Sequence, residues 1–80
     1  MVTIKQLRYF DAVVRFGHFG LAAQHCAVSQ PALSMQIRQL EDALGLTLIE
    51  RRASGVALTP EGRVVSERAA RILTEVRNLY

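Results

Sequence analysis

One segment, residues 29–45, constrains the fold of this 80-residue chain more than any other. Ser29 can cap a helix through its hydroxyl, and Pro31 is tolerated in a first helical turn because backbone N–H groups there lack an intrahelical partner. Gly45 is a natural helix stop. Between them, apolar residues recur at steps of four, three and four: Leu33, Ile37, Leu40 and Leu44. The pattern predicts an amphipathic helix over residues 30–44.

A short helix with a face of small residues is predicted just before it. Residues 20–27 read GLAAQHCA, and Ala22, Ala23 and Cys26 fall on one side of a helix. Small side chains let two helices approach closely. A short helix joined tightly to a longer one is typical of a helix-turn-helix.

The N-terminal residues predict a first helix. Thr3 and Gln6 have the spacing of a capping box, and Val2 and Leu7 are placed as a hydrophobic staple. Gly17 is expected to end this helix. Its apolar stripe is Leu7, Phe10, Val13 and Val14.

Residues after position 45 predict a hairpin and a last helix. The segments 46–50 and 56–59 are short and β-prone, and the loop 51–55 between them ends in glycine. Thr59 and Pro60 then mark a helix start, and no stop signal follows before the chain ends. The predicted fold class is mainly α: a winged helix-turn-helix with a three-helix core, a β-hairpin wing and a long C-terminal helix.

Composition and charge narrow the functional class. Ten Lys and Arg against seven Asp and Glu give a net charge of +3, which suits an anionic partner. No apolar run approaches the roughly 18 residues of a membrane span, and no secretory signal is visible, so we expect a cytoplasmic protein. Cys26 is the single cysteine, and His18 and His25 lack a third ligand. We therefore expect Cys26 to pack as a small hydrophobe, and we expect no cofactor, no metal and no enzymatic activity.

These motifs carry a resemblance to a known family. The run FGLAAQHCAVSQPALSMQIRQLEDALGLTLIERRASGVALTPEG resembles the N-terminal DNA-binding domain of LysR-type transcriptional regulators, over nearly the whole chain. Within the family, GHFGLAAQHCAVSQPALSMQI is similar to the peroxide-responsive OxyR branch. The resemblance implies a DNA-binding domain over residues 1–58, a linker helix over residues 59–80 that serves dimerisation, and an effector-binding domain that this chain lacks.

The start of the helix over residues 30–44 has the chemistry to read bases. A helix N-terminus suits a nearby phosphate, an amide such as that of Gln30 can pair with adenine, and a cation can position the helix on the backbone. By resemblance, the base-proximal residues in the major groove are Gln30, Pro31, Ser34 and Met35. The residues expected at the DNA backbone, with the wing over 51–55, are Ser29, Arg38, Arg51, Arg52 and Ser54.

Four positions depart from the commoner family pattern. Met35 stands where many members have arginine, so guanine readout by an arginine is not expected there. Gly20 replaces a frequent Ser or Thr and removes a hydroxyl that could meet a phosphate. Ser54 and Ala57 stand where the wing often has basic residues, and Arg52 is expected to compensate.

Instead of contacting DNA, the arginines could form ion pairs within the chain. Arg38 could pair with Asp42 at the i,i+4 spacing. Arg51 could pair with Glu41 or Glu50 and serve the structure alone.

The last helix carries an apolar seam at heptad spacing. Its members, expected at a dimer interface, are Val65, Ala69, Ile72, Val76 and Leu79. Part of the seam near Val65 could pack on the chain's own core, but the end over 72–79 is expected to pair antiparallel with a second subunit.

The expected partners are double-stranded DNA, a second copy of the chain through the linker helix, and RNA polymerase, with a tetramer in the full-length protein and no membrane. Two other interpretations stay open. One is a dimerisation module with little DNA affinity, and the other is the winged domain of molybdate-responsive regulators.

Overall fold

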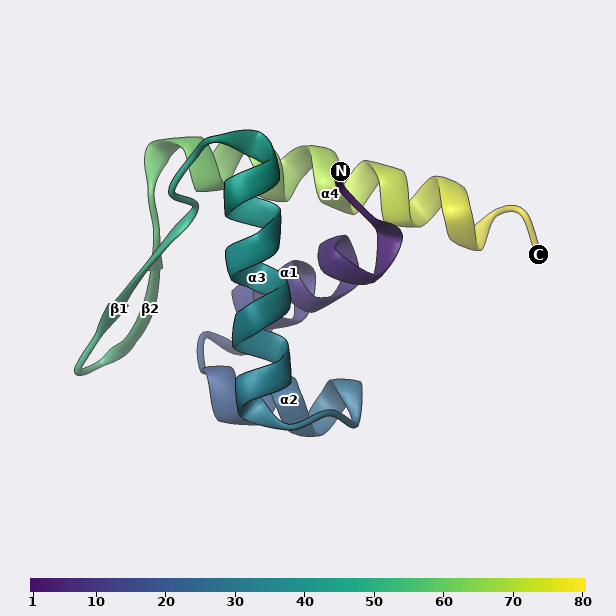
Figure 1. Ribbon diagram of the computed structural model, residues 1–80. Helices are drawn as coiled ribbons and strands as arrows, with labels where there is room; N and C mark the ends of the chain where they lie inside the picture. Colours follow the sequence, from purple (N-terminus) through teal and green to yellow (C-terminus); the bar gives the residue numbers. More distant parts are fainter.

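Three helices, a β-hairpin and a fourth helix follow one another along the chain (Figure 1). The computed structural model describes all 80 residues. The elements are α1 (Ile4–Phe16), α2 (Phe19–Cys26), α3 (Gln30–Leu44), β1 (Ile49–Arg52), β2 (Gly55–Leu58) and α4 (Pro60–Arg77). The predicted fold class, a winged helix-turn-helix with a long C-terminal helix, is confirmed.

Local capping explains where the first helices begin and end. The Thr3 hydroxyl accepts from the Gln6 backbone N–H at 3.1 Å, and the Gln6 side chain accepts from the Thr3 N–H at the same distance, as a capping box requires. Gly17 and Gly45 take left-handed backbone conformations, with φ of 64° and 67°, directly after α1 and α3.

One core joins all four helices. It consists of Leu7, Phe10, Ala12, Val13, Phe19, Ala22, Ala23, Leu33, Ile37, Leu40, Leu48, Ala69 and Leu73. The predicted small face of α2 is confirmed at Ala22 and Ala23, which are buried where α2 meets α1 and α3. Because Ala69 and Leu73 belong to the same core, α4 packs as part of the domain as far as Leu73 rather than as a free linker.

The strand positions predicted for the hairpin were wrong. The strands are antiparallel, with Ile49 opposite Leu58 and Arg52 opposite Gly55, so the turn is only Ala53–Ser54. Arg51 and Arg52, expected in a loop, lie in β1, because a two-stranded ribbon leaves one face in solvent and tolerates charge there. Gly55 permits the tight turn through its φ of 129°.

Three further expectations need correction. α2 spans residues 19–26 rather than 20–27, because Ala27 takes a left-handed conformation with φ of 57°. Leu44, expected in the buried stripe, is exposed because it lies in the last turn of α3 beyond the core. α4 ends at Arg77 rather than running to the end of the chain.

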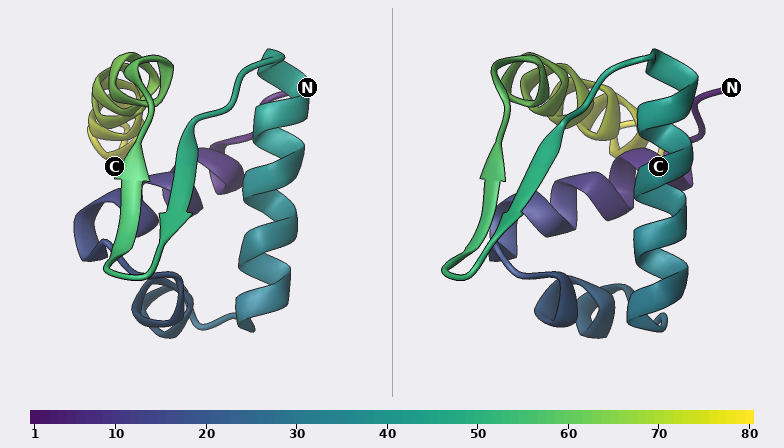
Figure 2. Two further views of the ribbon diagram at one scale, coloured as in Figure 1. Left: turned by 90° about the vertical axis from the view of Figure 1, so that its left-hand side faces the viewer. Right: turned by 60° about the vertical axis from the view of Figure 1, so that its left-hand side comes forward.

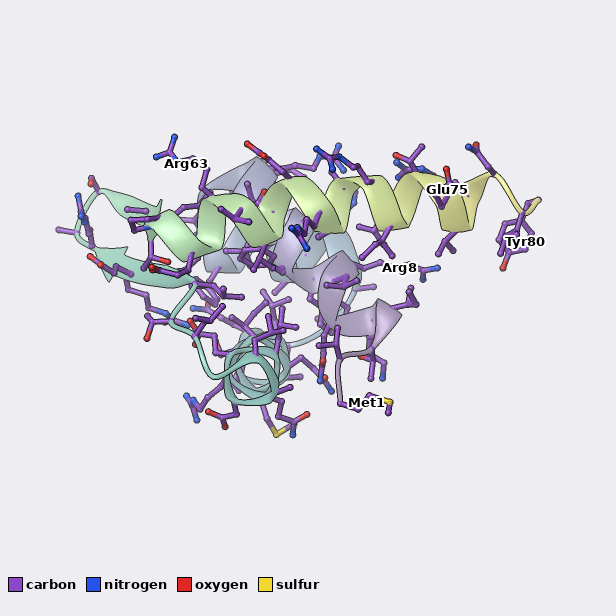
Figure 3. The ribbon with its side chains drawn as sticks, turned by 90° about the horizontal axis from the view of Figure 1, so that it is seen from above. Met1, Arg8, Arg63, Glu75 and Tyr80 are labelled. Carbon is purple, nitrogen blue, oxygen red and sulfur yellow. The ribbon has the colours of Figure 1, made fainter.

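The elements divide the molecule into two ends. The first turn of α3 and the tip of the hairpin point toward the same end, whereas α4 crosses the opposite end (Figures 1 and 2). Seen from above, the part of α4 that carries Glu75 projects past the body toward Tyr80, while Arg63 lies near its start (Figure 3). No helix combines the length and the apolar character that crossing a membrane requires.

Candidate nucleic-acid interface

The first turn of α3 presents a polar surface. The Ser29 hydroxyl accepts from the backbone N–H of Ala32 at 3.2 Å and caps the helix, and Pro31 lies in the first turn. Gln30 and Pro31 are exposed, and Ser34 is half-buried one turn further on. No acidic residue lies in this turn, so the positive end of the helix dipole is not neutralised locally.

Met35 extends this surface with an apolar side chain. Its exposed fraction is 49%, and it lies beside Ser34 in the sequence of α3. Of the predicted base-proximal residues, Gln30, Pro31 and Met35 are therefore exposed and Ser34 is half-buried. Whether they touch bases stays a prediction.

Arg51 joins β1 to the helix-turn-helix. Its guanidinium carbon lies 3.7 Å from the centre of the Phe19 ring, within cation–π range. Its Nη2 donates to the Ser34 hydroxyl at 2.6 Å. The alternative pairing of Arg51 with Glu41 or Glu50 does not form. Stacking was not predicted, because Phe19 and Arg51 are far apart in the sequence and their meeting depends on the fold.

The other predicted cations are exposed. Arg38 makes no ion pair with Asp42, so the intrahelical alternative for Arg38 does not form. Arg52 lies 3.4 Å from the Glu50 carboxylate, and both side chains are more than half exposed. Such an exposed pair contributes little to stability, so Arg52 can exchange Glu50 for another anion at small cost.

A hollow of about 300 Å³ separates α3 from the wing. Arg38 and Arg51 line it from the two sides, together with Ser34, Ile49 and Glu41. Two cations and a hydroxyl facing one open hollow can accept a phosphate group. The predicted backbone residue Ser54 lies at the exposed tip of the hairpin instead.

Glu41 fixes the base of the wing, a role that sequence reasoning missed. Its Oε2 accepts from the backbone N–H of Leu48 at 2.8 Å and of Ile49 at 3.4 Å. Its spacing of four from Ile37 places it toward the buried side of α3, and an acid there could have signalled a structural partner.

The other strand of the wing is tied to the turn between α1 and α2. The Val56 backbone N–H donates to the Gly17 carbonyl at 3.2 Å. A Cβ on Gly55 would lie 2.7 Å from the same carbonyl oxygen, so the close approach requires glycine.

His18 caps α2, which sequence reasoning also missed. Its Nδ1 accepts from the backbone N–H of Leu21 at 3.2 Å. A Cβ on Gly20 would lie 2.9 Å from the His18 ring, so Gly20 gives the imidazole room. Gly20 thus removes a hydroxyl from the start of α2, but it makes room for the His18 imidazole, which caps the helix instead.

Cys26 is half-buried beside the start of α1. It lines a surface hollow with Ile4, Lys5, Arg8 and His25. Partial burial raises the pKa of the Cys26 thiol, because the surroundings disfavour the thiolate.

A second surface, on α4, is apolar. Its hollow of about 410 Å³ is lined by Val2, Leu44, Leu46, Val64 and Ile72 among others. The exposed Leu44 and Leu46 were missed because the heptad spacing was followed within α4 alone, and Val64 was missed because it lies one residue before the predicted seam.

One of the predicted interface residues needs correction. Ala69 is 1% exposed inside one subunit, so it is not available to a partner. Leu73, one step off the predicted seam, is also buried, because the second half of α4 still contacts α1. Of the other predicted members, Val65 and Val76 are half-buried, and Ile72 and Leu79 are exposed.

Comparisons with known proteins agree with this geometry. Residues 4–63 match the family described as bacterial regulatory helix-turn-helix protein, lysR family. The RuBisCO operon transcriptional regulator of Allochromatium vinosum is 52% identical over 64 residues, which cover 80% of this chain and 21% of that protein. The hydrogen peroxide-inducible genes activator of Haemophilus influenzae is 44% identical over 78 residues, 98% of this chain and 26% of that protein.

A solved structure of the BenM DNA-binding domain with catB site 1 DNA superposes with a TM-score of 0.93 at 40% identity, covering 98% of this chain and 88% of that one. The chain spans only about a quarter of the length of the two curated relatives. The predicted resemblance is confirmed, and this chain belongs to the LysR family of bacterial regulatory helix-turn-helix proteins.

Proposed function

We propose that this chain is the DNA-reading part of a LysR-type transcriptional regulator and binds double-stranded DNA in a sequence-dependent way. The observation that carries the proposal is the surface at one end of the molecule. The exposed Gln30 lines one hollow with Arg51 and Arg52 of the wing. Ser34 lines another with Arg51 and Arg38. Neutral groups suit base edges, whereas cations suit the phosphates that flank a groove.

In this arrangement α3 enters the major groove and the wing lies along the backbone. Gln30 can pair with adenine through its amide, and Ser34 can bond either groove edge. Pro31 and Met35 present apolar atoms, which suit thymine methyl groups. The backbone contacts are assigned to Ser29, Arg38, Arg51, Arg52 and Ser54.

A second copy of the chain is the proposed occupant of the apolar surface on α4. Leu44, Leu46 and Val64 adjoin the exposed Ile72, so the apolar area continues past the seam predicted from α4 alone. Leu79 extends it on the projecting end. A two-fold pair of subunits would place two α3 helices in successive major grooves, about 34–36 Å apart.

The proposal extends to the role of this chain in a full-length regulator. Residues 1–58 are proposed as the reading unit and 59–80 as the linker helix to an effector domain, in a cytoplasmic regulator that forms tetramers and acts on RNA polymerase. The peroxide-responsive branch stays a prediction, because the relatives include both a RuBisCO operon regulator and a peroxide-inducible activator.

A salt series on a duplex of random sequence tests DNA binding. The logarithm of the binding constant should fall linearly with the logarithm of salt concentration, by about 0.9 for each phosphate that is neutralised. Arg52→Gln should make this slope shallower. Arg63→Gln, which removes the same charge from α4 at the opposite end, should leave it unchanged (Figure 3). No dependence on salt would contradict DNA binding and favour a dimerisation module.

A further inference from the structure

We infer that Arg51 is a positioning residue that decides which base edges Ser34 can address. The inference rests on the proposed DNA-binding function and deepens it. It concerns a hydrogen bond within the protein, between the wing and α3, and is separate from the backbone contact assigned to Arg51 above.

The geometry holds the guanidinium of Arg51 in one place. The Phe19 ring, buried at the start of α2, lies under it at 3.7 Å, and the Ser34 hydroxyl lies at its edge at 2.6 Å. The strand that carries Arg51 is itself held by Glu41 at its base. Arg51, although exposed to solvent, therefore connects α2, α3 and the wing through one planar group.

This contact changes what the Ser34 hydroxyl can do. A free serine hydroxyl offers one O–H donor and two acceptor lone pairs, and it can pair with almost any base edge. Arg51 occupies one lone pair with a cationic donor. The second lone pair lies next to a positive charge, which repels a further N–H donor, while the same charge makes the O–H a stronger donor.

Ser34 is thus biased toward acceptors on DNA. In the major groove these are guanine N7 and O6, adenine N7 and thymine O4, whereas cytosine presents an N4 donor. At the base pair that Ser34 meets, we expect guanine to be preferred over cytosine on the facing strand. A single neutral hydrogen bond corresponds to a preference of about two- to tenfold.

Selection from a pool of randomised duplexes measures this preference. The wild-type protein, Ser34→Ala and Arg51→Lys are each used to enrich the pool, and the bound duplexes are sequenced. Lysine keeps the charge of Arg51 but lacks the planar fork that stacks and donates in a fixed direction. Arg63→Lys is the matched control, because Arg63 lies near the start of α4 and takes no part in the proposed DNA contacts (Figure 3).

The expected result is a change at one shared base pair. Ser34→Ala should remove the guanine-over-cytosine preference there, and Arg51→Lys should reduce it at the same pair. Arg63→Lys should leave the profile unchanged. A wild-type profile in Arg51→Lys would overturn the inference, and so would a uniform loss of affinity in that variant, since Arg51 would then act as a phosphate contact alone.

Failure of the inference and failure of DNA binding give different results. If the wild-type protein showed no salt-dependent affinity for random duplexes, both the proposed DNA binding and the inference about Arg51 would be contradicted. A wild-type protein that binds DNA while Ser34→Ala leaves every base preference unchanged would remove only the role of Ser34 and Arg51.

The nuclear magnetic resonance signal of the Arg51 side-chain Nε–H reports the geometry without DNA. It should be shifted upfield by the Phe19 ring, keep that shift in Ser34→Ala, and lose it in Phe19→Leu. An unshifted signal in the wild-type protein would contradict the stacked geometry on which the inference depends.

Discussion

Gln30 is the residue that best separates sequence reading from general affinity for DNA. Its exposed amide lies in the first turn of α3, so Gln30→Ala should reduce discrimination between a selected site and random DNA by about 1–3 kcal/mol if the amide makes a bidentate contact. Arg52→Ala should weaken binding to both duplexes alike, because a phosphate contact carries no sequence information. Titrating each variant with the selected site and with random DNA gives the ratio of the two affinities for that variant. An unchanged ratio for Gln30→Ala would mean that another segment reads the bases.

The Cys26 thiol is expected to be a slow nucleophile. Burial raises its pKa, so a smaller fraction is thiolate at pH 8 than in the unfolded chain. Alkylation by iodoacetamide, followed by mass spectrometry, should be slower in the folded protein than in urea. The folded rate should still be rising at a pH where the unfolded rate has levelled. Faster alkylation of the folded protein would point to an activated thiol and against a packing role.

At the level of residues, the sequence predicted capping well and long-range contacts poorly. Thr3, Ser29 and Thr59 cap helices as expected, since a cap depends on neighbours within three residues. His18 caps α2 although histidine is not a usual cap, and Glu41 binds backbone groups seven and eight residues away. No local pattern encodes such contacts.

Among the elements, α3 was predicted to the residue and the wing was not. The ends of α3 are marked by Ser29 and Gly45, whereas no comparable signals mark the strands. The hairpin register is set by contacts with other elements, namely Glu41 on one side and Gly17 on the other. Strand propensity is weak compared with such tertiary contacts, so the predicted strands missed the observed ones by up to three residues.

Glu41→Ala should destabilise the wing and with it the fold. The substitution leaves the backbone N–H groups of Leu48 and Ile49 without their side-chain acceptor, which costs about 1–3 kcal/mol where water cannot replace it. Urea unfolding monitored by circular dichroism measures the loss. Asp42→Ala is the control, because the exposed Asp42 side chain makes no hydrogen bond, and it should change stability by less than about 0.5 kcal/mol. Equal losses would mean that the Glu41 contact is not a stabilising one.

The whole molecule is expected to form dimers through α4, and two adjacent residues separate dimerisation from folding. Ile72 is 43% exposed and Leu73 is 5% exposed. Ile72→Asp places a charge where apolar side chains of the second subunit are expected to pack, so it should disrupt the dimer while the monomer stays folded. Leu73→Ala should instead lower the free energy of unfolding by about 2–5 kcal/mol through the cavity that it leaves.

Sedimentation and circular dichroism read these two effects separately. Ile72→Asp should halve the mass, keep the helical spectrum and weaken binding to a two-half-site duplex, because the second half-site contact is no longer intramolecular. If Ile72→Asp remained dimeric, the subunits would meet elsewhere. If it unfolded, Ile72 would belong to the core.

The start of α4 is anchored to the chain that leads into the wing. The Thr59 hydroxyl donates to the Thr47 carbonyl at 2.6 Å and accepts from the Gly62 N–H at 2.9 Å. Gly62 lies so close to the Leu48 carbonyl that no side chain would fit. The root of α4 therefore cannot swivel without moving the wing.

Because of this anchorage, α4 and the helix-turn-helix with its wing are expected to move together as one rigid body. The 18 residues of α4 span about 27 Å. If α4 tilted by about 10° about its C-terminal end, its N-terminal end and the attached wing would move by about 5 Å, which is more than one base-pair step. In a symmetric pair the two displacements add or cancel according to the direction of the tilt. The spacing between half-sites that a dimer binds best would then depend on the angle at which the α4 helices of the two subunits cross.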